Sequence, residues 1–470
     1  MLSRKKFIAQ SGMLAAGIAM RPSLAFANNF ETKRPPLAYR KFTSEAVEAT
    51  IVGMKKKITD PELAWLFENC FPNTLDTTVE FEMIESKPDT YVITGDIDAM
   101  WLRDSTAQVW PYLPFIKNDA KLRELVEGVI NRQKKCIILD PYANAFYKDV
   151  NKISEWKSDL TKMQPGIHER KWEIDSLCYP IRLAYRYWKT SGDIKVFDAD
   201  WKQCIKLTLQ TFKEQQRKHG DGPYSFQRTT AWATDGVPLA GYGYPVKPVG
   251  LICSTFRPSD DATLFSFLVP SNFFAVVSLK QSAEILNAVY KDAAMANECL
   301  SLAKEVEKAL QQYAIIHHQQ YGKIYAFEVN GFGSFNLMDD ANVPSLLSLP
   351  YLNAVKSNDP IYVNTRKYLL SANNPFFFKG KAAEVIGGPH AGMFMIWPLS
   401  ITMRGLTSNH APEIKKCIHF LKTTHGGTGF MHESFYKDDA SKFTRKWFAW
   451  ANTLFGEFLM HVAEKHPALL

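Results

Sequence analysis

One amphipathic pattern, which recurs along most of the chain, restricts the fold more than any other feature. In residues 172–193, WEIDSLCYPIRLAYRYWKTSGD, apolar side chains recur with the period of a helix. This spacing predicts a helix with one buried face, and Ser191 and Gly192 are typical of its end. Pro180 lies inside the helix and is expected to kink it. The apolar positions are Ile174, Leu177, Cys178, Ile181, Tyr185 and Trp188.

Comparable stripes predict many further helices, whereas the alternation typical of a strand is clear only in KIYAFEVNGFG, residues 323–333. Helices without a heptad pattern favour a bundle, a solenoid or a closed toroid of helical hairpins. The lack of a fixed repeat of about 30–45 residues makes the solenoid the less favoured of these folds. Because no linker divides the sequence, one domain over residues 28–470 is expected. The predicted helices cover 43–57, 61–70, 104–116, 119–136, 195–217, 272–289, 292–315, 342–352, 361–371, 391–404, 412–423 and 447–465.

The first 27 residues have the pattern of an export signal. A basic start is followed by an apolar stretch at 12–20 and by Ala25-Phe26-Ala27, a small-x-small cleavage site. SRKKFI resembles a twin-arginine signal with Lys5 in the second basic place. The alternative is an amphipathic cytosolic N-terminus. The apolar stretch is too short to span a membrane, and no Cys precedes Cys70, so we expect an exported protein, periplasmic or secreted, without a stable membrane anchor.

Charge and cysteine spacing exclude several classes of protein. The net charge is +8, and removal of residues 1–27 takes away four basic residues and no acid, which leaves +4. Without a basic run interleaved with aromatic residues, nucleic acid is not expected as a partner. The 7 Cys are scattered without a CxxC pair, which argues against a zinc ribbon and a disulfide scaffold. The spacing leaves one or two bridges open.

Four segments rich in polar and aromatic residues interrupt the helical pattern. We name them by their motifs: the WLRD segment (94–113), the RPSDD segment (220–271), the GGPH segment (384–398) and the HESF segment (424–445). A loop as long as the RPSDD segment is usually functional or disordered, and its aromatic content argues against disorder. The four segments are therefore expected to converge on one mouth of a helical scaffold.

The chemistry of these segments points to carboxylates. The sequence contains no HExxH, no G-x-S-x-G and no phosphate-binding loop, so neither a protein-bound metal nor a serine nucleophile is expected. Carboxylates among aromatic rings suit glycosidic hydrolysis, which needs one protonated acid and one ionised carboxylate in different surroundings.

Two places in the chain offer such carboxylates. Asp260 and Asp261 are adjacent, so the charge of one favours the proton of the other, while Arg257 can fix one of them. Glu433 lies among apolar residues of the HESF segment. For each acid taken alone, a helix cap, a solvated loop or an ion pair is the competing interpretation, and Asp260 could cap a helix that begins at Ala262.

In this order, the motifs TGDIDAMWLRDSTAQVWPYL, FRPSDDAT with VPSN, GGPHAG with IWP, and GFMHESF resemble glycoside hydrolase family 125. That family consists of bacterial and fungal exo-acting α-mannosidases specific for α-1,6 linkages. The resemblance extends over roughly residues 40–465. It implies an all-α fold, an (α/α)6 barrel with long functional loops at one mouth, and an inverting mechanism without metal or cofactor.

The resemblance also implies roles for individual residues. Asp260 is expected to be the general acid, with Asp261 as the alternative, and Glu433 to be the general base. Inversion then predicts about 6.5–9.5 Å between the two carboxyl groups, which leaves space for a water.

Further residues of the same motifs are expected to bind the terminal mannose. Trp101 would line its pocket, Arg103 would donate to its hydroxyls and Asp104 would accept from them. Arg257 and His390 are expected to be further sugar contacts. Asp96 and Asp98 are interpreted as turn and cap residues ahead of a helix.

The expected partner is a mannose-containing oligosaccharide from N-glycans or mannans. Two alternatives stay open at this point: an inverting exo-glycosidase for another sugar or linkage, and a glycan-binding protein without turnover. The latter would be marked by a lost acid or base, and Asp260, Asp261 and Glu433 are all present.

Overall fold

Most of the apolar stripes form helices whose bounds lie close to the predicted ones. The computed structural model describes residues 30–470, so the expected export signal at 1–27 lies outside the described residues. Residues Thr32–Leu470 form one compact unit. The α-helices of the described residues are α2 (Glu45–Lys57), α3 (Pro61–Cys70), α4 (Asn73–Thr77), α5 (Leu102–Val109), α6 (Ala120–Leu139), α7 (Ile174–Ser191), α8 (Ala199–Gln215), α9 (Val269–Ile285), α10 (Ala293–Tyr313), α11 (Pro360–Leu369), α12 (Pro398–Leu406), α13 (Ala411–Thr423) and α14 (Ala449–Lys465).

Residues at the helix ends explain several of these bounds. The Asp60 carboxylate accepts a hydrogen bond of 3.0 Å from the amide of Leu63, and Pro61 occupies the first position of α3. Gly192 adopts φ 73° and ends α7 in the left-handed conformation, as the sequence predicts. Pro180 lies inside α7, which continues beyond it.

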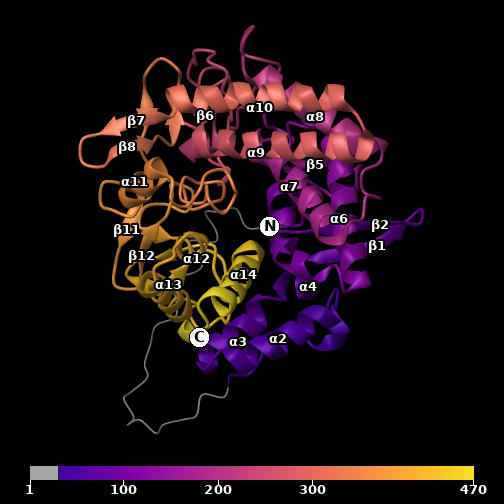
Figure 1. Ribbon diagram of the computed structural model, residues 1–470, viewed down its shortest axis with the longest axis vertical. Helices are drawn as coiled ribbons and strands as arrows, with labels where there is room; N and C mark the ends of the chain where they lie inside the picture. Colours follow the sequence, from indigo (N-terminus) through magenta and orange to yellow (C-terminus); the bar gives the residue numbers. More distant parts are fainter. Residues whose placement is uncertain (1–29) are drawn as a thin grey trace. The chain divides into compact units, whose positions relative to one another are not determined.

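Five of the helices form a ring. Helix α5 packs against α7 and α14, α7 packs against α9, and α12 packs against α14. A second set of helices covers this ring, because α3 contacts α14, α6 contacts α7, α10 contacts α9 and α13 contacts α12. Figure 1 shows α9 and α10 side by side, and α12, α13 and α14 grouped together.

An irregular segment, residues 343–354, packs against two of these inner helices, α7 and α14. The hydroxyl of Tyr179 in α7 donates to the carbonyl of Val343 at 2.8 Å. The hydroxyl of Tyr351 donates to Glu457 of α14 at 2.9 Å. The described residues form the predicted (α/α)6 barrel, with an inner set of helices covered by an outer set.

The helix predicted at 342–352 is wrong, since this segment consists of turns. The carboxylate of Asp339 accepts hydrogen bonds from the amides of Leu346 and Leu347, at 2.8 and 3.0 Å. Pro344 and Pro350 cannot donate to a helical hydrogen bond. The apolar stripe is nevertheless buried, so the pattern predicted burial correctly and conformation wrongly.

The strands of the described residues are short and pair antiparallel in small sheets, β1–β2, β3–β4–β5, β10–β9–β6, β7–β8, β11–β12 and β13–β14–β15. Strands β3, β6 and β13 lead into α5, α9 and α12, so three sheets hold the starts of inner helices. The bounds are β1 (Val79–Ile84), β2 (Lys87–Val92), β3 (Met100–Trp101), β4 (Ala145–Phe146), β5 (Ile167–Glu169), β6 (Phe267–Leu268), β7 (Ile315–His318), β8 (Gly322–Tyr325), β9 (Glu328–Val329), β10 (Phe335–Asn336), β11 (Phe377–Lys379), β12 (Glu384–Ile386), β13 (Met395–Ile396), β14 (Phe435–Tyr436) and β15 (Asp439–Phe443).

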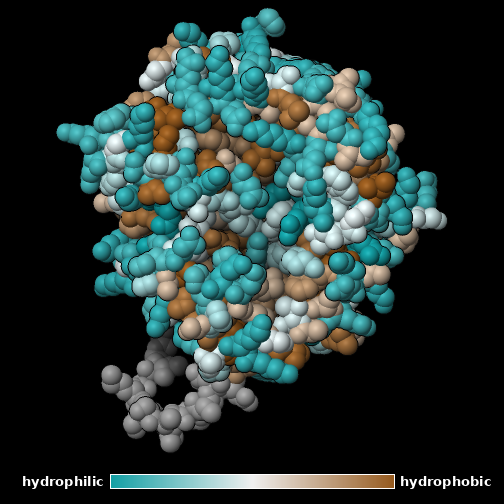
Figure 2. Space-filling model, in the orientation of Figure 1, coloured by the Kyte–Doolittle hydropathy of each residue, from teal (hydrophilic) through white to brown (hydrophobic). Residues whose placement is uncertain are grey.

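The apolar side chains of the inner helices form the core. All seven cysteines belong to the described residues, and each is a buried free thiol. On the face shown in Figure 2, hydrophilic side chains predominate and apolar ones form small separate groups. Among the helices of residues 30–470, none is long and apolar enough to cross a membrane.

Candidate active site

The four polar segments contact one another in a closed cycle. Arg103 of the WLRD segment reaches Asp260 of the RPSDD segment, and the neighbouring Asp261 pairs with His390 of the GGPH segment. Strand β13 of the GGPH segment pairs with β14 of the HESF segment. The cycle closes where Arg445, the last residue of the HESF segment, binds Asp96 of the WLRD segment. This agrees with the expected convergence: α5 begins within the WLRD segment, and α9, α12 and α14 begin at or near the ends of the other three segments.

Arg103 is the centre of a buried charge cluster. Its Nη1 lies 2.5 Å from Glu173 Oε2 and 3.1 Å from Asp175 Oδ2, and its Nη2 lies 3.0 Å from Asp260 Oδ1. Its Nε lies 3.6 Å from Asp104 Oδ2. Arg103 belongs to the first turn of α5, whereas Glu173 and Asp175 belong to the start of α7. Four carboxyl groups therefore surround one guanidinium.

This excess of carboxyl groups favours protonated forms. Burial raises the pKa of Asp104 to about 6; Arg103 opposes the shift, and the charge of Asp260 adds to it. Burial likewise raises the pKa of Glu173 well above its usual range, against Arg103 and with Asp260 and Asp175 contributing. The cluster can therefore retain protons near neutral pH.

Asp260 is held in an unusual backbone conformation. It has φ 67°, in the left-handed region that few residues other than glycine adopt. The ammonium of Lys171 donates to the Asp260 carbonyl at 2.8 Å and to Asp235 at 3.0 Å. Lys171 is itself buried, so this contact fixes the turn from inside the protein. The predicted alternative, a helix that begins at Ala262 and is capped by Asp260, is wrong, because α9 begins at Val269.

The adjacent acids Asp260 and Asp261 have different surroundings. The Asp260 side chain is 23% exposed, whereas that of Asp261 is 0% exposed and accepts from His390 Nδ1 at 3.3 Å. Although burial favours the protonated form of Asp261, the charge and hydrogen bond of His390 lower its pKa. Of the two, only Asp260 combines partial exposure with contact to the Arg103 cluster.

Glu433 lies at the start of the hairpin formed by β14 and β15. The hydroxyl of Thr444 donates to Glu433 Oε2 at 2.8 Å, and Arg445 Nη1 lies 3.5 Å from Oε1. The side chain of Glu433 is 15% exposed. Arg445 also acts electrostatically on Asp104, so the surroundings of Glu433 adjoin the Arg103 cluster.

The other predicted sugar contacts have distinct surroundings. Trp101 is buried in β3, with its ring edge-on to His168 at 5.2 Å, and its indole Nε1 has no acceptor among the described residues. Arg257 is buried and pairs with Glu328 at 2.7 Å. His390 lies beside Asp261, with its ring 6.0 Å from that of Trp397.

Several residues of this arrangement were not predicted. Glu173, Asp175 and Lys171 precede or begin the stripe of α7, and their acidic and basic types at a helix start were the available signal. Asp96 and Asp98 lie in a bend at 95–98, as the turn interpretation expects, but the cap interpretation is wrong, because α5 begins after Trp101 without a side-chain cap. Instead, Asp96 binds Arg445 and Asp98 binds Lys152.

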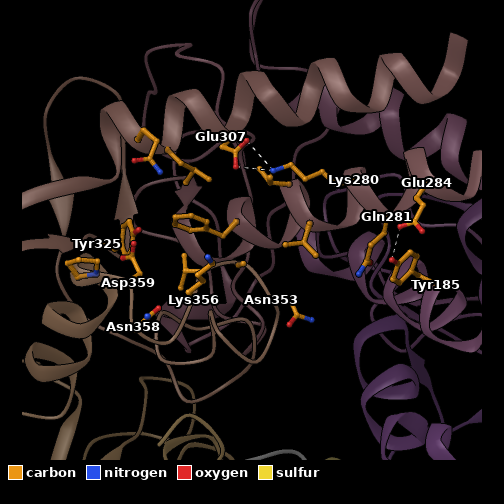
Figure 3. A pocket seen from close by; sticks show the side chains of 18 residues that line it. Tyr185, Lys280, Gln281, Glu284, Glu307, Tyr325, Asn353, Lys356, Asn358 and Asp359 are labelled. Atoms are coloured by element: carbon orange, nitrogen blue, oxygen red, sulfur yellow. Dashed lines mark hydrogen bonds and ion pairs between the residues drawn. The ribbon is translucent and has the colours of Figure 1, made fainter. Parts of the chain in front are cut away.

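A groove of about 700 Å³ lies apart from these segments, between α9, α10 and residues 353–360 (Figure 3). Its carboxylates already have partners. Glu307 pairs with Lys280 at 2.9 Å, Glu284 accepts from Tyr185 at 2.7 Å, and Asp359 caps α11. None of the four polar segments contributes a residue to the groove as described. The Arg103 cluster, with its shared charges, is therefore the better candidate for chemistry.

Comparisons with known proteins agree with this geometry. The family described as metal-independent alpha-mannosidase (GH125) matches residues 60–460. A Schizosaccharomyces pombe protein, the meiotically up-regulated gene 157 protein, is 42% identical over 456 residues, which cover 93% of this chain and 89% of that protein. A Streptococcus pneumoniae metal-independent α-mannosidase, solved in a non-productive complex with α-1,6-mannobiose, is 40% identical with a TM-score of 0.87, and the match covers 90% of this chain and 99% of that chain.

More distant structures share the fold alone. A Bacillus sp. GL1 rhamnosidase of family GH78 is 12% identical with a TM-score of 0.52, over 91% of this chain and 36% of that chain. The barrel and its carboxylate-rich mouth, together with the closer relatives, define a glycoside hydrolase. The chain belongs to the GH125 family of metal-independent α-mannosidases.

Proposed function

We propose that this α-mannosidase removes α-1,6-linked mannose from the non-reducing ends of N-glycans or mannans, with inversion at the anomeric carbon. The observation that carries the proposal is the contrast between two carboxylates on one cycle of contacts. Asp260 belongs to an acid-rich cluster, and Glu433 lies beside a guanidinium and a hydroxyl. The α-1,6-mannobiose bound by the Streptococcus pneumoniae relative supports the linkage.

In this mechanism, protonated Asp260 donates its proton to the glycosidic oxygen, and the bond from that oxygen to the anomeric carbon breaks. A water attacks the carbon from the opposite face and passes its proton to ionised Glu433. The two carboxyl groups have different surroundings, as an acid and a base require: Asp260 lies among the carboxyl groups that share Arg103, and Arg445 adjoins Glu433. Asp261, buried and paired with His390, is the less favourable acid.

The terminal mannose lies between these groups in the proposed complex. Asp104 accepts hydrogen bonds from its hydroxyls, Arg103 orients the acids, and Trp101 offers its unpartnered indole N–H. His390 and Arg257 are proposed as outer contacts. The burial of Arg257 and its pair with Glu328 support an indirect role for Arg257, through the turn that carries Asp260.

A linkage panel tests this function. Rates on α-1,2-, α-1,3- and α-1,6-mannobiose and on an α-glucoside should be highest by far for the α-1,6 linkage. Proton NMR of the first product should show β-mannose, and initial α-mannose would contradict inversion. Equal rates on all linkages would leave an α-mannosidase with another specificity.

We also propose that the protein is exported after cleavage behind Ala27. The basic, apolar and small-residue pattern of residues 1–27 supports this proposal. N-terminal sequencing of protein recovered from the periplasm or medium should begin at Asn28. Recovery of uncleaved protein from the cytosol alone would refute export.

A further inference from the structure

A bridge between the first and last polar segments adjoins the proposed general base. Arg445 binds Asp96 through Nε, at 3.2 Å from Oδ2, and through Nη2 to Oδ1. Its remaining terminal nitrogen, Nη1, lies 3.5 Å from Glu433 Oε1. Two parallel contacts between a guanidinium and one carboxylate fix the guanidinium plane. The direction of Nη1 is therefore set by Asp96.

The backbone around Glu433 is held by other contacts. His432 Nδ1 donates to the carbonyl of Arg445 at 2.8 Å, and the imidazole stacks on Phe443 at 3.9 Å. The amide of Thr444 donates to the carbonyl of Ser434 at 3.0 Å. The chain before β14, which carries Glu433, and the chain after β15, which carries Arg445, are thus fixed to each other, and the long Arg445 side chain is the adjustable part.

We propose that Asp96 is a positioning residue for Glu433, acting through Arg445, and that Thr444 orients the second oxygen of the same carboxylate. This inference rests on the proposed function, in which Glu433 is the base. Asp96 neutralises part of the Arg445 charge and holds Nη1 beside Glu433 Oε1, while the Thr444 hydroxyl donates to Oε2.

The charges around Arg445 predict the direction in which loss of the Asp96 charge changes the basicity of Glu433. The charged groups that act on Arg445 are Glu433 and Asp96, with Asp104 of α5 behind them. Without the Asp96 charge, Arg445 stabilises ionised Glu433 more strongly, so Glu433 becomes a weaker base. A lost structural contact alone would not make the base weaker in this manner.

Asp96→Asn tests the proposal on the full chain. We expect kcat on α-1,6-mannobiose to fall about twofold to fivefold, and the acid limb of the kcat pH profile to move to lower pH. Thr444→Val, which removes a hydrogen bond to a charged group, should lower kcat about 10- to 100-fold with a smaller change in KM. Arg445→Lys combined with Asp96→Asn should cost less than the two single changes together, because Lys lacks the fork that Asp96 holds.

Asp98→Asn is the matched control, since Asp98 lies in the same loop and is 71% exposed against 56% for Asp96. It pairs with Lys152 and should leave kcat and the pH profile unchanged. If Asp96→Asn behaves like Asp98→Asn in both, the positioning role is overturned. Glu433→Gln separates the two hypotheses, because full activity of that variant would remove the base assignment itself.

Discussion

The surroundings of Asp260 and of Glu433 differ in their ratio of acids to cations. At Asp260, three further carboxyl groups share Arg103, and Lys171 reaches the Asp260 backbone carbonyl instead of the side chain. At Glu433, the nearest groups are the Arg445 guanidinium and a hydroxyl. One barrel mouth thus places two carboxyl groups in different surroundings, as the proposed acid and base roles require.

The backbones under the two carboxylates differ as well. Asp260 lies in a loop turn with φ 67°, stabilised by the buried Lys171. Glu433 lies two residues before β14, which pairs with β13 of the GGPH segment. Asp260 is therefore held by side-chain contacts from the residues just before α7, and Glu433 by the hairpin that follows it.

Exchanging either carboxyl for its amide should have the largest effect. Asp260→Asn and Glu433→Gln should each lower kcat about 10²- to 10⁴-fold, because proton transfer at the leaving group or the water is lost. Steady-state rates on α-1,6-mannobiose measure this. Asp261→Asn is the comparison, and a greater loss there than in Asp260→Asn would reassign the acid.

Removal of the shared guanidinium should test the acid-rich region next. Arg103→Met leaves several buried carboxyl groups without their cation, so the free energy of unfolding should fall by about 3–5 kcal/mol. Urea denaturation measures this change. Arg103→Lys keeps the charge without the fork and should be intermediate in stability and low in activity. A stable, active Met variant would show that the cluster does not need its cation.

Asp104 should make stability depend on pH in a defined direction. Its pKa of about 6 lies above the usual value of 3.8, so the folded state binds the proton more tightly. Stability is therefore lost as pH rises from about 4 through about 6, and this loss is complete above both values. The Asp104→Asn variant does not show this loss, so its free energy of unfolding should rise by about 1–3 kcal/mol relative to the parent between pH 4 and pH 7. If the difference in unfolding free energy between variant and parent is the same at pH 4 and at pH 7, the assignment is contradicted.

The groove beside α9 should give the smallest effect. Lys280 and Glu307 are each 49% exposed, so Glu307→Gln should change the unfolding free energy by less than about 1 kcal/mol and leave kcat unchanged. Thermal unfolding and mannobiose hydrolysis measure both. A clear loss of activity would extend the functional region beyond the mouth of the barrel.

Sequence periodicity predicted what is local and buried. The stripe of α7 and its end at Gly192 were confirmed, because both depend on neighbours along the chain. The hairpin of β1 and β2 was missed, since its turn uses Glu85 and Ser86 at φ 48° and 63° in place of the usual Gly or Asn. The turns at 343–354 were missed because Asp339 takes up amides that a helix would use.

In the candidate site, too, local motifs were predicted and long-range contacts were not. The motifs supplied Asp260, Glu433, Arg103 and Asp104, whose roles remain predictions for experiment. The partners that distinguish the two carboxylates could not be found from spacing. Glu173 is 70 residues from Arg103, and Asp96 is 349 residues from Arg445, so only the closed barrel brings them together.

That last separation has a consequence for biosynthesis. A ribosome delivers the WLRD and RPSDD segments long before the HESF segment, so a nascent chain can assemble the Arg103 cluster while it still lacks Glu433. The cycle of contacts closes only when β14, β15 and α14 have been made and docked against α5. In the proposed mechanism, hydrolytic activity therefore requires the final hairpin, and chains that end before Glu433 are expected to be inactive on a glycan.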